Sequence, residues 1–327
     1  MNGSLRKGLS LLPAAQGRAR APVLSERAWG RLCAAPALVF LATFALAPVL
    51  AGIWLSLQRR LPIFGVIEFV GLRNYLLLFQ DERFWAAGRT TLYFTIVSVG
   101  AELALGLGLA LLLERALAGR SGDDSLRAGG GRQSWMRVMV LIPWAVPTVV
   151  SARLWGWLYQ PEYGLLNYLL AASGLMHDPI NWLSDPWWAL HAAILMDVWK
   201  TTPFAALLLL AALKAIPAEL YLAARVDGAR GWASFRHITL PLLTPVLLIV
   251  LTFRTMDAFR VFDAVYVLTG GGPGNGTETL SIYAYKTLFQ ALRFGYGSAL
   301  STVTFLAILL ITAGYLLLLQ RQLRATA

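Results

Sequence analysis

Six long apolar segments are the feature that most constrains how this chain can fold. They cover residues 31–57, 89–113, 138–159, 190–213, 238–261 and 298–319. Each is long enough to cross a bilayer, which takes about 20 residues of helix. Charged side chains make up only 14% of the 327 residues, whereas a soluble domain carries about 25%. The sequence therefore predicts an all-α, polytopic protein with six transmembrane helices and nearly excludes a soluble enzyme.

The distribution of the 28 basic residues predicts the orientation. Seventeen lie in the N-terminal region to residue 31, in the loops after the second and fourth segments, and at the C-terminal end. Because positive charge favours the cytoplasmic side, both termini and these two loops are expected to be cytoplasmic. The net charge of +11 thus indicates a lipid bilayer as partner and no nucleic acid. The first external loop is more basic than this rule favours, with Arg59, Arg60, Arg73, Arg83 and Arg89.

The chain divides by composition into three parts. Residues 1–30 are expected to form a disordered basic cytoplasmic tail, residues 31–320 a transmembrane domain, and residues 321–327 a short cytoplasmic tail. The first 28 residues lack the apolar core of a signal peptide, so we expect the first helix to stay uncleaved. Residues 58–88 are expected to form a short amphipathic structure resting on the membrane.

The loop at residues 214–237 carries the most informative local pattern. Pro217 suits the start of a helix, Glu219 its first turn and Gly228 its end. Small side chains share one face of this helix, as expected of a docking surface. An ordinary amphipathic connector explains the same pattern. The small face comprises Leu220, Ala223, Ala224 and Ala229.

Several motifs together carry a family resemblance. The loop sequence IPAELYLAARVDGA at 216–229, followed by Leu240-Pro241, resembles the coupling-helix signature of permease subunits of bacterial ABC importers. Further stretches are similar to the carbohydrate-import branch, and most of all to maltose and trehalose permeases. They are FVGLRNY at 69–75, IPWAVP at 142–147, YGLLN at 163–167, DVWKTTPF at 197–204 and LTGGGP at 268–273.

The resemblance implies a set of partners in the bacterial cytoplasmic membrane. These are a second homologous permease in a heterodimer, two ATP-binding subunits and an extracytoplasmic sugar-binding protein. The ATP-binding subunits would dock on Glu219, Leu222, Ala223, Ala224, Arg225, Asp227 and Gly228. The family usually has Glu at the position of Leu222, and in relatives that Glu contacts the ATPase subunit. Glu219, Arg225 or Asp227 would have to replace this contact, or docking would be mainly apolar.

No cofactor or catalytic site is expected in this chain itself. The glycine-rich run at 270–276 lacks the Lys and Ser/Thr that a phosphate-binding loop needs. ATP and Mg²⁺ would therefore be bound by the partner subunits. His177, His191 and His237 are too scattered for a metal triad.

Ionisable residues inside the apolar segments mark function or internal pairing, because they are costly in lipid. Four pairs are spaced three apart and share a helix face: Asp197–Lys200, Arg254–Asp257, Asp257–Arg260 and Arg260–Asp263. One interpretation is a salt-bridge ladder that braces the fourth and fifth segments. The other is a polar wall that binds cargo. Glu102 and Arg153 also lie within segments.

The resemblance implies import of a disaccharide or short oligosaccharide by alternating access. In maltose-type permeases the sugar lies near the bilayer midplane, and the matching positions here are Trp144, Thr148, Thr201, Phe204, Val250, Arg254 and Asp257. Lys200 together with Arg254 would instead suit glycerol-3-phosphate, the second cargo considered. An ion-coupled secondary transporter is the alternative class, and paired broken helices in inverted repeats would favour it.

Overall fold

We describe the fold from a computed structural model, in which residues 25–118, 131–176 and 178–326 are described. The chain divides into two compact units, residues 1–51 and 52–327. In the first unit, α1 (Glu26–Leu41) continues through a π-helical turn (Ala42–Leu46) into α2 (Ala47–Ser56), which crosses the unit boundary. The first 24 residues of the expected tail lie outside the described residues. The helix begins at Glu26, earlier than the expected residue 31.

The second unit begins with a β-hairpin, which an all-α prediction did not include. Strands β1 (Gln58–Leu61) and β2 (Val66–Phe69) pair antiparallel, with Gln58 opposite Phe69 and Leu61 opposite Val66. A 3-10 turn (Pro62–Phe64) and Gly65, at φ +63°, connect them. The short helix α3 (Arg73–Phe79) follows. The expected amphipathic structure at 58–88 is therefore a hairpin and a helix, and its last residues belong to α4.

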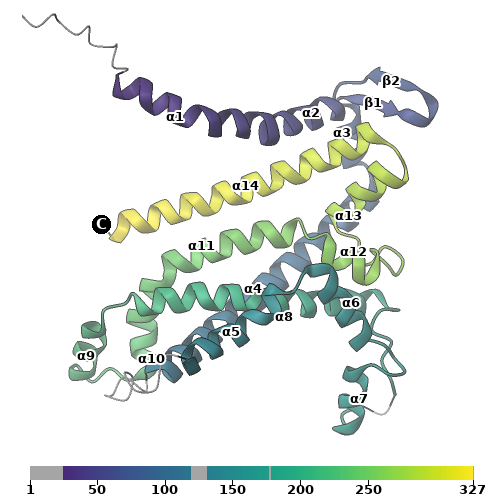
Figure 1. The fold of residues 1–327 in the computed structure, drawn as a ribbon. Coiled ribbons are helices and arrows are strands. Elements are labelled where there is room, and N and C mark those ends of the chain that lie inside the picture. Colours follow the sequence, from purple (N-terminus) through teal and green to yellow (C-terminus); the bar gives the residue numbers. More distant parts are fainter. Residues whose placement is uncertain (1–24, 119–130, 177, 327) are drawn as a thin grey trace, which may run out of the picture. The chain divides into compact units, whose positions relative to one another are not determined.

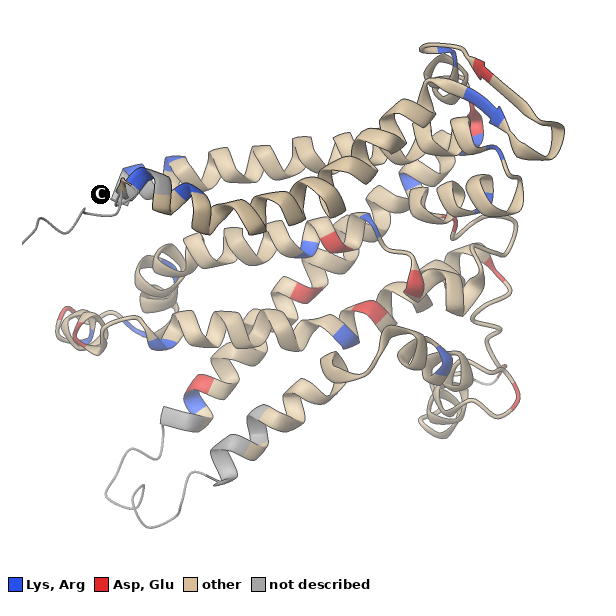
Figure 2. Cartoon of the chain, turned by 45° about the horizontal axis from the view of Figure 1, so that its top comes forward, with Lys and Arg blue, Asp and Glu red and all other residues tan. Residues whose placement is uncertain are grey.

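Four further long helices confirm the predicted membrane spans. They are α4 (Glu82–Ala118), α8 (Pro186–Lys214), α11 (Leu240–Phe259) and α14 (Phe294–Thr326). Together with the segment Trp29–Ser56, they contain five stretches long and apolar enough to cross a membrane. Figure 2 shows long stretches of these helices without charge, interrupted by a few acidic and basic residues within α4, α8 and α11. Helix α14 continues through most of the expected C-terminal tail at 321–327.

The third predicted span is broken. Helices α5 (Gly131–Ala145) and α6 (Thr148–Leu158) meet at an angle of 93°. Pro147 has no N–H to continue α5, and it disfavours helical backbone at Val146 before it. Pro147 itself is extended, with ψ 140°. The span predicted over 138–159 is therefore bent, and counting this pair as one span brings the candidate spans of the described residues to six.

The core of the second unit is built around α4 and α8, which pack along much of their lengths. A Cβ at Gly106 of α4 would lie 3.0 Å from Ala205 Cβ of α8, so these helices approach closely. Buried clusters occupy both ends of the pair. One includes Phe94, Met196 and Val265, and the other includes Leu113, Leu209 and Leu243.

Short helices connect the spans at both ends of the unit. At one end, α9 (Ala218–Val226), α10 (Gly231–Ser234) and a π-helical turn (Phe235–Thr239) lie between α8 and α11. At the other end are the β-hairpin and α12 (Asp263–Thr269), α13 (Leu280–Tyr285) and a second π turn (Lys286–Gln290), as Figure 1 shows. Helix α7 (Leu165–Ala172) follows α6.

Candidate functional site

Lys200 of α8 donates hydrogen bonds to backbone carbonyl groups at the break in the third span. Its Nζ donates to the carbonyl oxygen of Val146 at 2.5 Å and to that of Trp144 at 3.3 Å. Backbone carbonyls freed by a break must find a partner in a membrane, and an ammonium group supplies one. The expected ion pair between Lys200 and Asp197 is absent from the described ion pairs, so that expectation was wrong. Lys200 is occupied by carbonyl groups instead.

Two aromatic side chains stack beside this break. The rings of Trp144 and Phe204 are 5.9 Å apart at an interplanar angle of 18°. Trp144 is 49% exposed and Phe204 is half-buried, so the Trp144 ring keeps an accessible face. Thr148 begins α6 immediately after the break and is also half-buried. The structure therefore brings these three predicted residues together around one feature.

A charge network links α4, α8 and α11. Arg254 Nε of α11 lies 2.5 Å from Glu102 Oε2 of α4, and Arg254 Nη2 lies 2.9 Å from Glu102 Oε1. Both side chains are buried, and two parallel bonds of this kind are the strongest arginine–carboxylate geometry. Asp197 of α8 approaches Arg254 at 3.5 Å. Helix α11 is thus tied to two other spans through one guanidinium group.

The network reaches a more exposed end at Asp257. Its carboxylate lies 3.5 Å from Arg254 Nη1 and 2.7 Å from Arg260 Nη2, and its side chain is 48% exposed. The expected pairs Arg254–Asp257 and Asp257–Arg260 are confirmed. No Arg260–Asp263 ion pair occurs among the described residues, so that expectation was wrong. Asp257 and Arg260, whose side chain is 66% exposed, are the parts of the network that a bound molecule can reach.

Two further predicted site residues, Thr201 and Val250, are buried. Thr201 is buried, and its hydroxyl contacts Glu102 Oε1 at 2.7 Å and the Asp197 carbonyl at 2.6 Å. Val250 has no exposed surface. Its side chain therefore cannot contact a cargo in this conformation. The prediction for Val250 is therefore the weakest of the set in geometric terms.

Glu102 was predicted to lie within a span, but the sequence did not assign it a partner or a role. The sequence pairs came from spacing within one helix, whereas Glu102 and Arg254 are 152 residues apart. A useful signal was present, because Glu102 has no basic residue three or four positions away in its own segment. A buried carboxylate without a local partner requires one on another helix.

Helix α9 has the form expected of a docking helix. It begins after Pro217 and ends before Gly228, whose φ of +79° is typical of a helix C-terminal turn. None of its residues is buried. The Tyr221 hydroxyl lies 3.0 Å from Thr239 Oγ1 and anchors α9 to the start of the fifth span.

The predicted docking residues are accessible on this helix. Leu222 is 57% exposed, and Glu219, Ala223, Arg225, Asp227 and Gly228 are exposed while Ala224 is half-buried. Within the described part of the chain, the side chains of Glu219, Arg225 and Asp227 have no hydrogen bond or ion pair. Leu222, Arg225 and Trp232 line a hollow of about 1210 Å³ together with the ends of α4 and α8. The surface combines free charges with exposed apolar groups.

No metal site is formed by the described residues, since no group of three or more His, Cys, Asp or Glu lies close enough to hold an ion. His177 lies outside the described residues. His191 contacts the Tyr93 hydroxyl at 2.9 Å and the Trp187 carbonyl at 2.7 Å, and His237 contacts the Ala233 carbonyl. His191 is thus bonded to its own helix and to Tyr93 of α4, and His237 is bonded to the carbonyl group four residues before it.

Comparison with protein families identifies the architecture. Residues 116–324 match the model of the binding-protein-dependent transport system inner membrane component. The chain belongs to this family. It is therefore a multi-pass permease subunit of the inner membrane, as its spans and α9 indicate.

Curated relatives of the permease are named as sugar transport components. It is 45% identical over 291 residues to the trehalose/maltose transport system permease protein MalF of Thermococcus litoralis, covering 89% of this chain and 93% of the relative. It is 38% identical to the sulfoquinovosyl glycerol transport system permease protein SmoG of Agrobacterium fabrum, covering 90% and 91%. It is also 38% identical to the trehalose transport system permease protein SugA of Mycobacterium tuberculosis, covering 86% and 85%.

Solved structures share the fold of this permease. A chain of a bacterial ABC transporter involved in the import of alginate superposes with a TM-score of 0.73 at 24% identity, covering 90% of this chain and 96% of that one. At this identity the likeness concerns the fold alone.

Proposed function

We propose that this permease imports a neutral disaccharide or short oligosaccharide of the trehalose or maltose type. The 45% identity to a trehalose/maltose permease over 89% of the chain carries this proposal. The accessible part of the proposed cargo site is Trp144, Thr148, Phe204 and Asp257. The buried Thr201, Val250 and Arg254 and the carbonyl-bound Lys200 complete the predicted set. Trp144 offers an apolar ring face for a pyranose, and Asp257 offers an acceptor for sugar hydroxyls.

The charge balance of the site favours a neutral cargo. Arg254 is surrounded by the carboxylates of Glu102, Asp197 and Asp257, and Lys200 is turned to backbone carbonyls. Little positive charge is left to attract a phosphate. Glycerol-3-phosphate, which needs an excess of positive charge at the site, therefore fits less well.

We infer that transport proceeds by alternating access driven by separate ATP-binding subunits. Two such subunits, with their ATP and Mg²⁺, would bind on the cytoplasmic side of this permease and a second homologous permease. Helix α9 would transmit the movement of the ATP-binding subunit to the membrane helices. Leu222 and its apolar neighbours would take over the contact that relatives make through Glu. A sugar-binding protein would deliver cargo to the opposite face, and both termini would be cytoplasmic.

An ion-coupled transporter is less well supported. That class is typically built from inverted repeats with paired broken helices, whereas one broken span occurs within the described segments. Arg254 also satisfies the buried acids, which leaves Asp257 as the accessible carboxylate of the network.

The assembled complex with its binding protein, reconstituted in liposomes, tests this function. We expect ATP-dependent accumulation of labelled trehalose or maltose that persists when the proton gradient is dissipated. Accumulation of glycerol-3-phosphate in preference to either sugar would contradict the cargo. Uptake that stops with the gradient and continues without ATP would contradict the transporter class.

A further inference from the structure

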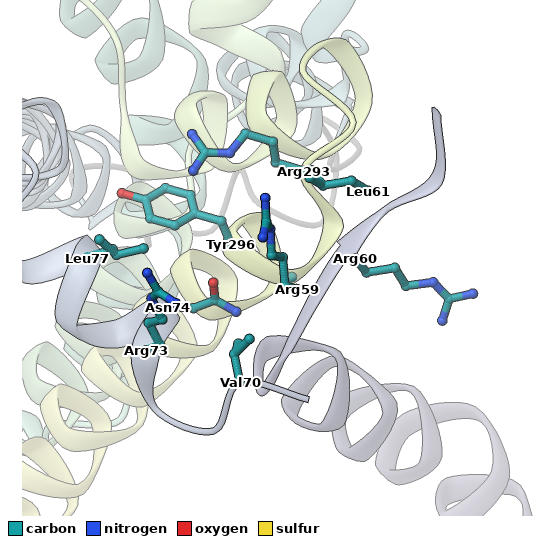
Figure 3. A pocket seen from close by; sticks show the side chains of 10 residues that line it. Arg59, Arg60, Leu61, Val70, Arg73, Asn74, Leu77, Arg293 and Tyr296 are labelled. Carbon is teal, nitrogen blue, oxygen red and sulfur yellow. The ribbon is translucent and has the colours of Figure 1, made fainter. Parts of the chain in front are cut away.

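A basic cavity lies at the end of the second unit that carries the hairpin. It has a volume of about 370 Å³ and lies between β1, α3 and the start of α14. Its lining includes Arg59, Arg60, Arg73 and Arg293, together with Asn74 and Tyr296. Figure 3 shows Arg59 directed into the space near Tyr296 and Arg293, whereas Arg60 extends away from it.

The backbone around this cavity is fixed by short contacts. Asn74 Nδ2 donates to the carbonyl oxygens of Ser56 at 2.8 Å and Gln58 at 2.9 Å. Gly295 packs so closely on β1 that a Cβ there would lie 1.8 Å from the Gln58 oxygen. The end of α2, the hairpin, α3 and α14 are therefore held together before any ligand binds. Pre-organisation of this kind lowers the entropic cost of binding.

Among the described residues, Arg59 is the one arginine of this cavity with a carboxylate partner, and that pair is exposed to solvent. Glu68 lies 3.7 Å from Arg59, and both side chains are more than half exposed. Arg293 lies over the ring of Tyr296 at 4.7 Å. The side chains of Arg60 and Arg73 have no ion pair or hydrogen bond within the described part of the chain. The cavity therefore keeps an unbalanced positive charge, which favours an anionic ligand.

The surroundings of the cavity indicate that the anion belongs to a lipid. The hairpin turn exposes Ile63 and Phe64, which are 67% and 75% accessible, and Phe69 and Leu72 are 66% and 67% accessible. Apolar side chains beside arginines at the ends of membrane helices place a surface at the level of the lipid headgroups. Phosphate groups are the most abundant anions at that level, and guanidinium groups bind them bidentately.

We propose that this cavity binds the phosphate of an anionic phospholipid headgroup, with Arg59, Arg73 and Arg293 as its ligands. The acyl chains lie along the exposed apolar side chains of the hairpin and α3. The site is at the end of the second unit opposite α9 (Figure 1), and so is separate from the docking helix. It gives a role to Arg59 and Arg73, two of the basic residues of the first external loop, and Arg73 belongs to the FVGLRNY motif.

Native mass spectrometry of the assembled complex in detergent tests this site, with dioleoylphosphatidylglycerol as the probe and zwitterionic dioleoylphosphatidylcholine as the comparison. We expect tighter binding of phosphatidylglycerol to the wild type. The double variant Arg73→Gln/Arg293→Gln is expected to weaken it about tenfold. The matched controls Arg60→Gln, whose side chain points away, and Arg89→Gln, an exposed arginine of α4, are expected to leave it nearly unchanged.

Three results would overturn the proposal. The first is equal binding of the two lipids by the wild type. The second is an unchanged phosphatidylglycerol affinity in the double variant, whether or not its affinity for the binding protein falls. The third is displacement of the lipid by inorganic phosphate at an equal concentration, which would indicate a small-anion site. The Arg73→Lys/Arg293→Lys variant keeps both charges and is expected to retain most of the affinity. It shows whether the weaker binding of the Gln variant comes from loss of charge or from misfolding.

Discussion

Arg254 Nε lies 2.5 Å from Glu102 Oε2, and this buried pair joins the fifth span to the second. Asp197 and Asp257 approach the same guanidinium group from α8 and α11. The network thus braces the bundle at Glu102 and is open to a ligand at Asp257. We propose that the two interpretations of the intramembrane charges, bracing and cargo binding, apply to different ends of this network.

Removal of Arg254 should be strongly destabilising. Arg254→Leu leaves Glu102 and Asp197 buried without a cation, and loss of one partner of a buried pair costs about 3–5 kcal/mol. We expect a clear fall in the unfolding temperature of the detergent-solubilised complex. Glu102→Gln, Arg254→Gln and their double variant form the control cycle, with an expected interaction energy of about 0.5–3 kcal/mol. Additive effects within error would show that the pair is energetically independent.

Loss of the Lys200 ammonium should loosen the broken span. Lys200→Met removes the donors to the Val146 and Trp144 carbonyls, and such charged hydrogen bonds contribute about 1.5–3 kcal/mol. We expect lower thermal stability and slower uptake. Arg153→Met removes one positive charge from an exposed position of α6 and is the matched control. Equal effects of the two variants would argue against a specific role for Lys200.

Charge reversal on α9 should separate ATP hydrolysis from transport. Arg225→Glu places a negative charge on the exposed docking face, and an unfavourable charge at an interface is expected to reduce coupling at least about tenfold. Asp227→Ala should act in the same direction. The readout is sugar uptake per ATP hydrolysed by the reconstituted complex, with Arg324→Glu on α14 as the control. Wild-type coupling in both α9 variants would refute the docking assignment.

Acid should weaken the loop that contains Glu278. Burial alone would raise the pKa of Glu278, but hydrogen bonds from Arg83 at 2.6 Å and Lys286 at 2.9 Å outweigh burial and lower this pKa below 4.5. The stabilisation is therefore complete above pH 4.5 and is lost as the pH falls through the lower, folded-state pKa.

Thermal unfolding above and below pH 4.5 checks this dependence. Glu278→Gln is expected to be less stable than the wild type above pH 4.5 and to show a shallower loss of stability on acidification. Glu162→Gln, at an exposed acid before α7, should retain the wild-type slope. A Glu278→Gln slope identical to that of the wild type would contradict the assignment.

Much of the fold could be predicted because its signals are local. Hydropathy located the spans, and Pro217 and Gly228 located the ends of α9. Spacing of three residues predicted the contacts of Asp257 with Arg254 and Arg260. The break had a local signal in Pro147, but hydropathy reports only the extent of the apolar segment and not its bend.

The interhelical contacts had no such local signal. The pairing of Glu102 with Arg254 and the binding of Lys200 to carbonyls 54 and 56 residues away depend on how α4, α8 and α11 pack. The convergence of Arg73 and Arg293 on one cavity depends on the docking of α14 against the hairpin. Sequence patterns identified these residues as unusual but gave no information about their partners.

Sugar uptake by the Trp144→Ala and Asp257→Ala variants of the reconstituted complex tests the proposed cargo site most directly. Trp144 supplies the accessible ring at the broken span, and Asp257 supplies the accessible carboxylate of the network. We predict that each variant assembles in normal amounts, keeps its ATP-binding subunits and loses ATP-driven accumulation of trehalose or maltose. Unchanged uptake in both variants would contradict the proposed cargo site.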